Sequence, residues 1–335
     1  MNLAFKLAGA ALFLASGAAS AASTRLTVYS GLENEQLAPY KKAFEADNPD
    51  IEIRWVRDSN GVITAKLLAE KNNPQADVIW GVAASSLLLL QQQGMLLPYA
   101  PKGVAALKPS FRDPADPPSW VGMDAWMAAI CFNGAEAKAK NLPRPNSWAD
   151  LANPVYKGQI VMPNPASSGT GFLAVSGWLQ LMGEAPAWAY MDKLNANIAA
   201  YIHSGSKPCK MVAAGEYPIG ISMEYAGVQQ KNEGAPIEVI LPAEGTGWEI
   251  EATAILKGGH NQEAAKRLAD WAASKAASET YARFYAITAL PGTPRKVANY
   301  PDDAESRMLA KNDFAWAAQH RDAILATWGE RYQGK

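Results

Sequence analysis

The stretch PNPASSGTGF (163–172) places two serines, a threonine and two glycines together, and hydroxyl groups at this spacing can bind an anion. The apolar run before it, 158–162, predicts a strand, and apolar residues at helical spacing after it predict a helix that begins near residue 168. A helix start offers free backbone N–H groups and the positive end of the helix dipole. The alternative is an ordinary helix cap followed by a tight turn. We predict that this loop holds an anion through Ser167, Ser168, Gly169 and Thr170.

A second hydroxyl-rich stretch, HSGSKPC (203–209), has the same character. Ser204 or Ser206 can cap a helix whose first turn contains Pro208, a position where proline fits. In open α/β sheets, ligands bind in the crevice at the carboxyl ends of the strands, so two such helix starts can converge there. Together they suit a group with several acceptor oxygens and negative charge, such as phosphate, phosphonate or sulfate. We add Ser206 to the predicted anion site.

Three carboxylates lie close to apolar runs: Glu33 follows the first predicted strand, Asp124 interrupts a long one, and Glu224 follows another. Glu33 could face the cleft from the strand end. A carboxylate beside buried apolar surface is costly unless it is paired, so Asp124 and Glu224 each need an internal Arg or Lys or a cationic ligand. Tyr225 could contact the ammonium group of such a ligand, although a single tyrosine is more typical of the core. The sequence therefore suggests a cleft that takes an anion at one end and an ammonium at the other.

Alternating strands and helices follow one another from residue 25 to residue 94, a pattern that predicts a mostly parallel sheet with helices on both faces. A long extended run, WVGMDAWMAAICFN (120–133), precedes a second α/β series. Strands 237–242 and 247–256 are predicted to return to the first series, and 261–285 to form one long amphipathic helix. The predicted fold class is α/β, with two doubly wound lobes joined by crossing strands that close around a ligand by hinge motion. The predicted division is a signal peptide (1–21), lobe 1 (22–122), lobe 2 (123–236), the return to lobe 1 (237–290) and a C-terminal helical tail (291–335).

The N-terminus predicts export. One positive charge, the apolar run LAGAALFLASGAA and the small residues ASA are typical of a signal peptide that is cleaved near Ala21. The predicted location is the bacterial periplasm, and no other run predicts a transmembrane span. The chain holds 31 Lys plus Arg and 32 Asp plus Glu, a balance that argues against nucleic acid or an anionic membrane as the main partner.

Cys131 and Cys209 are the only cysteines, and their spacing leaves open whether they form a disulfide or stay as two buried thiols. His203, His260 and His320 lie far apart and form no metal motif, so no metal and no cofactor is predicted. The chain has no GxSxG elbow, no HExxH motif and no Asp/His cluster, and we predict that it is not an enzyme.

Five stretches resemble one known family, the 2-aminoethylphosphonate-binding proteins of bacterial ABC importers. They are LTVYSGLENEQLAPYKKAFE, DSNGVITAKLLAEKNNPQADVIWG, VMPNPASSGTGF, HSGSKPC and EATAIL. The resemblance covers essentially the whole mature chain and implies a type II periplasmic binding protein fold, near the ferric-ion-binding proteins. It also implies a receptor, expected to be a monomer, that delivers 2-aminoethylphosphonate to an inner-membrane permease.

The same resemblance favours a phosphonate over ferric ion as the ligand. Iron-binding relatives tend to carry a histidine where this chain has Glu33, and adjacent tyrosines where it has Tyr225 and Ala226. Fe(III) favours phenolate and carboxylate oxygens, so a single tyrosine with no nearby histidine is a poor match. The anion loop of those relatives is kept as residues 168–170. By this comparison Ser206 faces the anion, and Glu33 or Glu224 faces the amine.

Two alternatives stay open at this point. The first is a receptor for another small ligand: ferric ion, inorganic phosphate or another organic anion. The second is an exported hydrolase that acts on phosphonates or phosphate esters, which turnover would reveal, because a receptor returns its ligand unchanged.

Overall fold

The computed structural model describes residues 23–309 and 311–332, so the predicted signal peptide lies outside the described residues. The helices are α1 Asn34–Asp47, α2 Asn60–Ala69, α3 Ala84–Gln92, α4 Gly134–Ala139, α5 Gly169–Met182, α6 Glu184–Asn197, α7 Lys207–Ala213, α8 Glu224–Asn232, α9 Gln262–Ala272, α10 Lys275–Tyr281, α11 Ala304–Arg307 and α12 Phe314–Tyr332. The strands are β1 Thr24–Ser30, β2 Ile51–Arg57, β3 Val78–Ala83, β4 Val121–Asn133, β5 Ile160–Pro163, β6 Ile198–Ile202, β7 Ile219–Met223, β8 Ile237–Ile240, β9 Trp248–Ile255 and β10 Ile287–Thr288.

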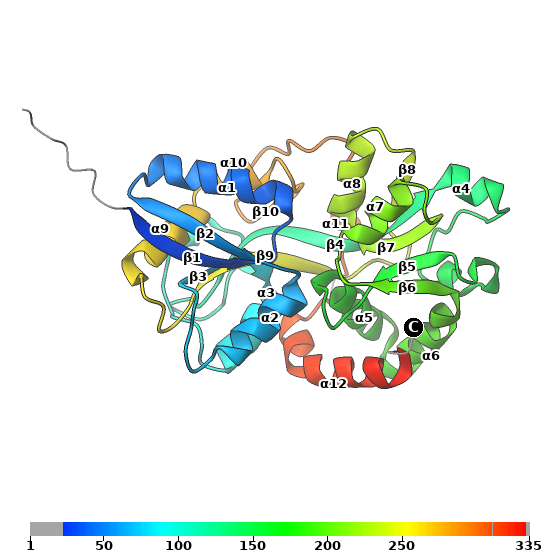
Figure 1. Ribbon diagram of the computed structural model, residues 1–335, viewed down its shortest axis with the longest axis horizontal. Coiled ribbons are helices and arrows are strands. Elements are labelled where there is room, and N and C mark those ends of the chain that lie inside the picture. The colour runs from blue at the N-terminus through cyan, green and yellow to red at the C-terminus, as the bar shows by residue number, and fades with distance from the viewer. Residues whose placement is uncertain (1–22, 310, 333–335) are drawn as a thin grey trace, which may run out of the picture.

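The strands form one mixed sheet in the order β2-β1-β3-β9-β4-β7-β5-β6, with β8 and β10 paired to β4. We call β1–β3 with their helices the first half and β5–β8 with theirs the second half; they lie at opposite ends of the molecule, and β4 and β9 run between them (Figure 1). Within each half, the pairs β1–β2, β1–β3, β5–β6 and β5–β7 are parallel. The crossing strands β4 and β9 pair antiparallel with each other and with their neighbours. The α/β fold predicted from the sequence is confirmed.

The crossing strand β4 explains the long apolar run seen in the sequence. All thirteen of its residues are buried, because the strand is covered on both faces and serves both halves of the sheet. Aromatic clusters fill the core on either side: Trp80 packs between Trp55 and Tyr40 in the first half, and Trp178 packs against Trp148 in the second.

Two details differ from the expectation. The strand β8 pairs with Ile130–Asn133 of β4, on the edge opposite β7, so of the two predicted strands only β9 returns to the first half. The predicted long helix over 261–285 is two helices, because Ser274 caps α10: its hydroxyl accepts a hydrogen bond from the N–H of Ala277. The lobe boundaries themselves stay a prediction.

The last helix, α12, packs against the body of the protein. Trp328 meets the ring of Tyr201 edge-on at 4.9 Å, and the guanidinium of Arg321 lies 4.4 Å from the ring centre of Phe172. Near α3, α12 also contacts the first half of the molecule. The C-terminal helix therefore touches both halves.

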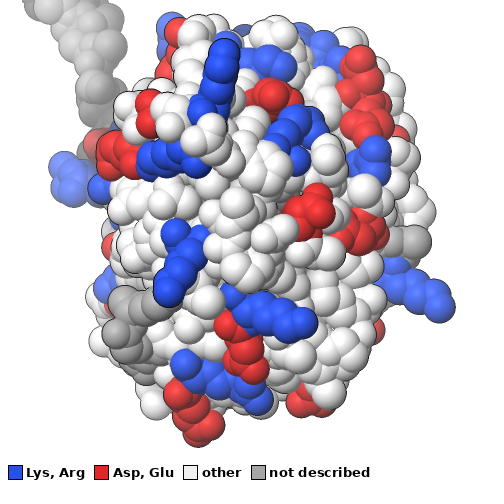
Figure 2. All heavy atoms as spheres, turned by 90° about the vertical axis from the view of Figure 1, so that its right-hand side faces the viewer, with Lys and Arg blue, Asp and Glu red and all other residues white. Residues whose placement is uncertain are grey.

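The two cysteines form a disulfide between β4 and α7, with 5.4 Å between the Cα atoms of Cys131 and Cys209. Of the two alternatives that the sequence left open, pairing is the correct one. The face at the right-hand end of Figure 1 carries basic and acidic side chains interspersed over a mostly uncharged surface (Figure 2). That mixture agrees with the nearly balanced charge of the chain.

Candidate ligand-binding site

A cavity lies where the carboxyl ends of the parallel strands of both halves meet the crossing strands. The first half contributes residues that end or follow β1 and β2. The second half contributes the start of α5, the turn after β6 and one residue of β7. The crossing strands β4 and β9 supply the rest. Its lining residues are Gly31, Glu33, Arg57, Ser59, Asn60, Trp126, Ser168, Gly169, Thr170, Gly205, Met223 and Glu251.

Two helix N-termini face this cavity from opposite halves: Ser59 precedes α2 and Ser168 precedes α5. The helix starts are in contact, since the N–H of Gly61 donates to the carbonyl of Ser167 at 3.1 Å. A Cβ atom on Gly169 would lie 2.7 Å from Cβ of Asn60, so only glycine allows this approach. The positive ends of two helix dipoles are thereby brought to one place.

The hydroxyl groups of the predicted anion loop have different surroundings. Ser168 accepts a hydrogen bond from the N–H of Gly171 as the helix cap, which leaves its O–H free to donate. Thr170 lines the cavity and is buried. Ser167 is not among the lining residues, and its hydroxyl donates to the carbonyl of His203 at 3.0 Å. The helix start itself, from Ser168 to Thr170, is thus the part that the structure brings to the cavity.

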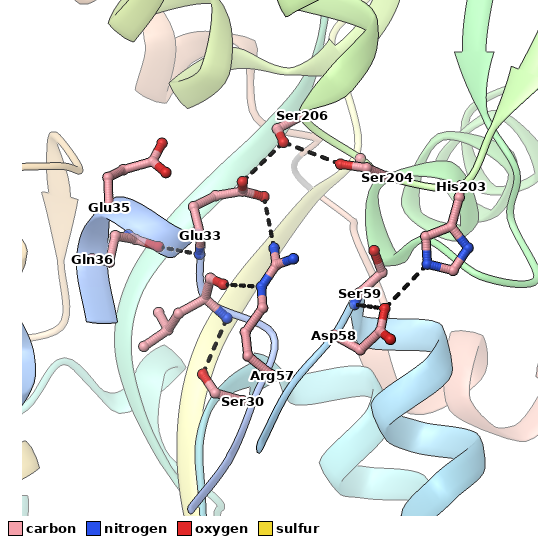
Figure 3. A network of polar contacts seen from close by, with 12 residues as sticks. Ser30, Glu33, Glu35, Gln36, Arg57, Asp58, Ser59, His203, Ser204 and Ser206 are labelled. Carbon is pink, nitrogen blue, oxygen red and sulfur yellow. Dashed lines mark hydrogen bonds and ion pairs between the residues drawn. The ribbon is translucent and has the colours of Figure 1, made fainter. Parts of the chain in front are cut away.

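Arg57 is the cationic side chain of the cavity wall. Its Nε donates to the carbonyl of Leu32 at 2.7 Å, and its guanidinium lies 3.5 Å from Oε1 of Glu33. Ser206 donates to Oε2 of the same carboxylate at 2.9 Å, so Glu33 lies between Arg57 and Ser206 (Figure 3). Burial raises the pKa of Glu33, while Arg57, Ser206 and the Lys210 ammonium at 3.9 Å act in the opposite direction. Ser206, predicted to face the anion, instead contacts this carboxylate and is not among the lining residues.

His203 and Asp58 form a further contact between the halves beside this cluster. Nε2 of the histidine lies 3.1 Å from Oδ1 of the aspartate, and both side chains are largely exposed (Figure 3). Although burial works against it, the hydrogen bonds from His203 and from the N–H of Ser59 leave the pKa of Asp58 below its usual value.

The floor of the cavity holds Trp126 of β4 and Glu251 of β9, and Asp124 lies beneath it. Asp124 stands directly opposite Glu251 in the register of the two crossing strands. Tyr285 donates to Oε1 of Glu251 at 3.1 Å. Burial raises the pKa of Glu251 to about 8, and burial together with the neighbouring carboxylates raises the pKa of Asp124 strongly.

Glu224 and Tyr225 lie outside the lining residues. Glu224 is fully buried, accepts hydrogen bonds from the N–H of Met127 and the hydroxyl of Tyr300, and has a pKa that burial raises to about 7. The partners that this carboxylate was predicted to need are therefore neutral donors inside the protein. Tyr225 packs against Tyr285 with 5.0 Å between ring centres.

Eight of the lining residues are not among the predicted site residues: Gly31, Arg57, Ser59, Asn60, Trp126, Gly205, Met223 and Glu251. Arg57 is the last residue of β2, so the strand-end argument that found Glu33 could have found it. Trp126 and Glu251 carry no such signal, because they lie inside strands and not at a strand end.

Among the described residues, no group of three or more His, Cys, Asp or Glu side chains is arranged to hold a metal ion. In the same part of the chain, no helix has the length and apolar character needed to cross a membrane.

The fold and the cavity define a class of protein: a two-part α/β protein with a cavity between its halves, the place where ligands bind in open α/β sheets. A family profile described as bacterial extracellular solute-binding protein matches residues 73–317, and the chain belongs to that family. Its fold is that of the type II periplasmic binding proteins. Binding proteins of this family deliver small ligands to ABC permeases.

Three similar proteins illustrate the family. An uncharacterized protein of Haemophilus influenzae is 32% identical over 319 residues, which cover 93% of this chain and 92% of that protein. A putative 2-aminoethylphosphonate-binding periplasmic protein of Salmonella typhi is 26% identical over 81% of this chain and 80% of its own. The structure of the periplasmic binding protein AfuA from Actinobacillus pleuropneumoniae, with fructose-6-phosphate bound, has a TM-score of 0.84 at 30% identity and covers 93% of this chain and 99% of its own.

Proposed function

We propose that this protein is the periplasmic receptor of an ABC importer and captures a small solute that carries a phosphate or phosphonate group. The observation that supports this proposal best is that two helix N-termini and Arg57 line one cavity. Each helix start offers backbone N–H donors and a positive dipole end, and a guanidinium can form two parallel hydrogen bonds to a phosphate. In this proposal Ser59, Asn60, Ser168, Gly169 and Thr170 surround the anion.

The rest of the ligand has two candidates. The first is a sugar phosphate, favoured by the likeness to AfuA, which was solved with fructose-6-phosphate and covers almost the whole chain. The second is 2-aminoethylphosphonate, favoured by the Salmonella typhi relative and by the presence of carboxylates in and under the cavity. In the second case Glu33 or Glu251 faces the ammonium group. We place the sugar phosphate first, because the similarity to AfuA is the greater in identity and in coverage.

Ferric ion is a weaker candidate. Tyr225 is 3% exposed and packs in an aromatic cluster outside the cavity lining, so its phenol is not offered to a ligand. Hydrolysis is weaker still, since the Salmonella typhi relative and AfuA are both named as binding proteins. In this proposal the mature protein acts as a periplasmic monomer and passes its ligand unchanged to the permease.

A thermal-shift panel on the purified mature protein tests the proposal. The panel contains fructose 6-phosphate, 2-aminoethylphosphonate, ethylphosphonate, inorganic phosphate and ferric citrate. A ligand at a hundred times its dissociation constant stabilises the folded state by about 2.7 kcal/mol, which moves the midpoint by about 4 °C in a chain of this size. We expect a shift with one of the first two compounds, and a smaller shift for it in a Thr170→Ala variant.

Three results would contradict the proposal. A shift with ferric citrate alone would mean that the protein binds a metal and not a phosphate. The absence of any shift with the phosphorus compounds would mean that the cavity does not bind their anionic group. Release of inorganic phosphate from a bound ester would show an enzyme in place of a receptor.

A further inference from the structure

The carboxylate of Glu33 is held by side chains from both halves of the molecule. Glu33 lies at the start of α1, in the first half, and the guanidinium of Arg57 in the same half lies 3.5 Å from its Oε1. From the second half, the hydroxyl of Ser206 donates to its Oε2 at 2.9 Å (Figure 3). The ammonium of Lys210, also in the second half, lies 3.9 Å from the same oxygen. Two of these three partners therefore belong to the opposite half.

These contacts depend on how the two halves stand to each other. Ser206 precedes α7, which packs on β7 and α8 of the second half, whereas Glu33 precedes α1, which packs on β2 of the first half. Periplasmic binding proteins close around their ligands by a hinge motion of their two parts. A hinge motion that separates the halves would break the hydrogen bond from Ser206 to Glu33. It would leave the pair of Glu33 and Arg57 intact, because both residues belong to one half.

The balance of charge around Glu33 would change when an anion enters the cavity. Arg57 lines the cavity, so under the proposed function its guanidinium pairs with the anion of the ligand. That anion would share the positive charge that faces Glu33, and a buried carboxylate is costly when it loses part of its cationic partner. The hydroxyl of Ser206 and the ammonium of Lys210 would compensate for this loss, and both reach Glu33 from the opposite half.

We propose that Glu33 is a positioning residue that couples capture of the anion to closure: it holds Arg57 at the cavity wall and binds Ser206 of the second half in the closed state. This inference rests on the proposed function, because it needs an anion at Arg57. It also gives Glu33 a role other than contact with a ligand ammonium, since its two oxygens already face Arg57 and Ser206. Of the two carboxylates named for that contact, Glu251 remains.

The variant Ser206→Ala tests the coupling without changing the cavity wall, because Ser206 carries no charge and is not among the lining residues. Titration calorimetry and stopped-flow tryptophan fluorescence measure affinity and rates with fructose 6-phosphate, 2-aminoethylphosphonate and ethylphosphonate. We expect Ser206→Ala to weaken every compound that the wild-type protein binds about fivefold, which corresponds to the loss of one hydrogen bond. The loss should appear in the dissociation rate, since the contact between the halves forms after the ligand has entered.

Two further variants assign the effect to the contact with Glu33. Ser204→Ala is the matched control, because Ser204 lies in the same turn and its hydroxyl is 3.2 Å from that of Ser206, within one half; it should change the affinities less than about twofold. In a Glu33→Gln background the effect of Ser206→Ala should fall to about twofold, since a neutral acceptor forms a weaker hydrogen bond than a carboxylate. Glu33→Gln should also leave the ratio of the affinities for 2-aminoethylphosphonate and ethylphosphonate unchanged.

The outcomes separate this inference from the proposed function. If the wild-type protein binds none of the three compounds, the proposed function fails and the inference with it. If Ser206→Ala leaves binding unchanged, or weakens it only through the association rate, the proposed function stands and the coupling is refuted. A Glu33→Gln variant that loses affinity for 2-aminoethylphosphonate alone would also refute the coupling, because Glu33 would then contact the amine.

Discussion

The facing carboxyl groups of Asp124 and Glu251 predict an unusual dependence of the free energy of unfolding on pH. Burial raises the pKa of Glu251 from 4.5 to about 8, so the folded protein holds a proton there that the unfolded chain has lost. The stabilising contribution of this protonated group is fully present below pH 4.5 and is lost as the pH rises towards 8. The folded state should therefore become less stable as the solution becomes alkaline.

The size of the effect follows from the two pKa values. At about 1.4 kcal/mol for each pH unit between them, ionising Glu251 lowers the free energy of unfolding by at most about 4–5 kcal/mol. Glu251→Gln removes this dependence, because the amide carries no titrating proton and its NH₂ group can donate to Asp124. Between pH 7 and pH 8 the variant should gain about 1 kcal/mol relative to the wild-type protein. Asp124→Asn should give a similar gain, since the two carboxyls titrate as a pair.

Urea unfolding at pH 5, 6, 7, 8 and 9, followed by tryptophan fluorescence, measures the free energies. Glu249→Gln is the control, because Glu249 is a buried carboxyl on the same strand whose pKa is raised only to about 7. Its titration is nearly complete at pH 8, so this variant should gain only about 0.3 kcal/mol between pH 7 and pH 8. If wild type and Glu251→Gln lose stability equally over that interval, Asp124 and Glu251 do not hold a proton in the folded state, and the reasoning is wrong.

Two further predictions concern the cavity wall and the disulfide. Arg57→Met should weaken binding of fructose 6-phosphate or 2-aminoethylphosphonate, whichever the protein binds, about tenfold to a hundredfold in calorimetry, because a charge-assisted hydrogen bond to the anion is lost. Lys210→Met should change that affinity less than about threefold, because the Lys210 side chain is 41% exposed and is not among the lining residues. Equal losses in the two variants would mean that the net positive charge of the region, and not a direct contact, attracts the anion. Replacing both Cys131 and Cys209 by alanine opens a loop with a sequence separation of 78 and should lower the free energy of unfolding by about 3–4 kcal/mol, whereas no loss in urea unfolding would mean that the cross-link does not constrain the unfolded chain.

The parts of the site that could be predicted from the sequence depend on local patterns. Ser168 to Thr170 were found because an apolar strand, a hydroxyl-rich turn and a helical repeat follow one another within a few residues. Glu33 was found because it follows the first strand. Both the order of elements and the carboxyl-end rule act over short segments, so one sequence is enough to apply them.

The remaining parts depend on contacts between distant segments. Glu224 was recognised as a carboxylate beside buried surface, but its partners lie 97 residues before it and 76 residues after it. Asp124 was recognised for the same reason, yet its neighbour Glu251 is set by the register of β4 against β9. No local pattern carries that register, because it is set by the pairing of two strands that lie far apart in the chain and are buried along nearly their whole length.

The contacts that join the two halves across the cavity are of kinds that contribute little stability. The pair His203–Asp58 is largely exposed, so water and salt screen it. The bonds from Gly61 to Ser167 and from Ser206 to Glu33 exchange protein partners for water when the halves separate, at a net cost of about 1 kcal/mol each. A receptor held shut by its own contacts would admit ligand slowly and bind it with reduced apparent affinity, since the competent open state would be rare. Under the proposed function, weak contacts between the halves let the ligand decide between the open and closed states, because an anion that binds helix starts from both halves at once favours the closed state.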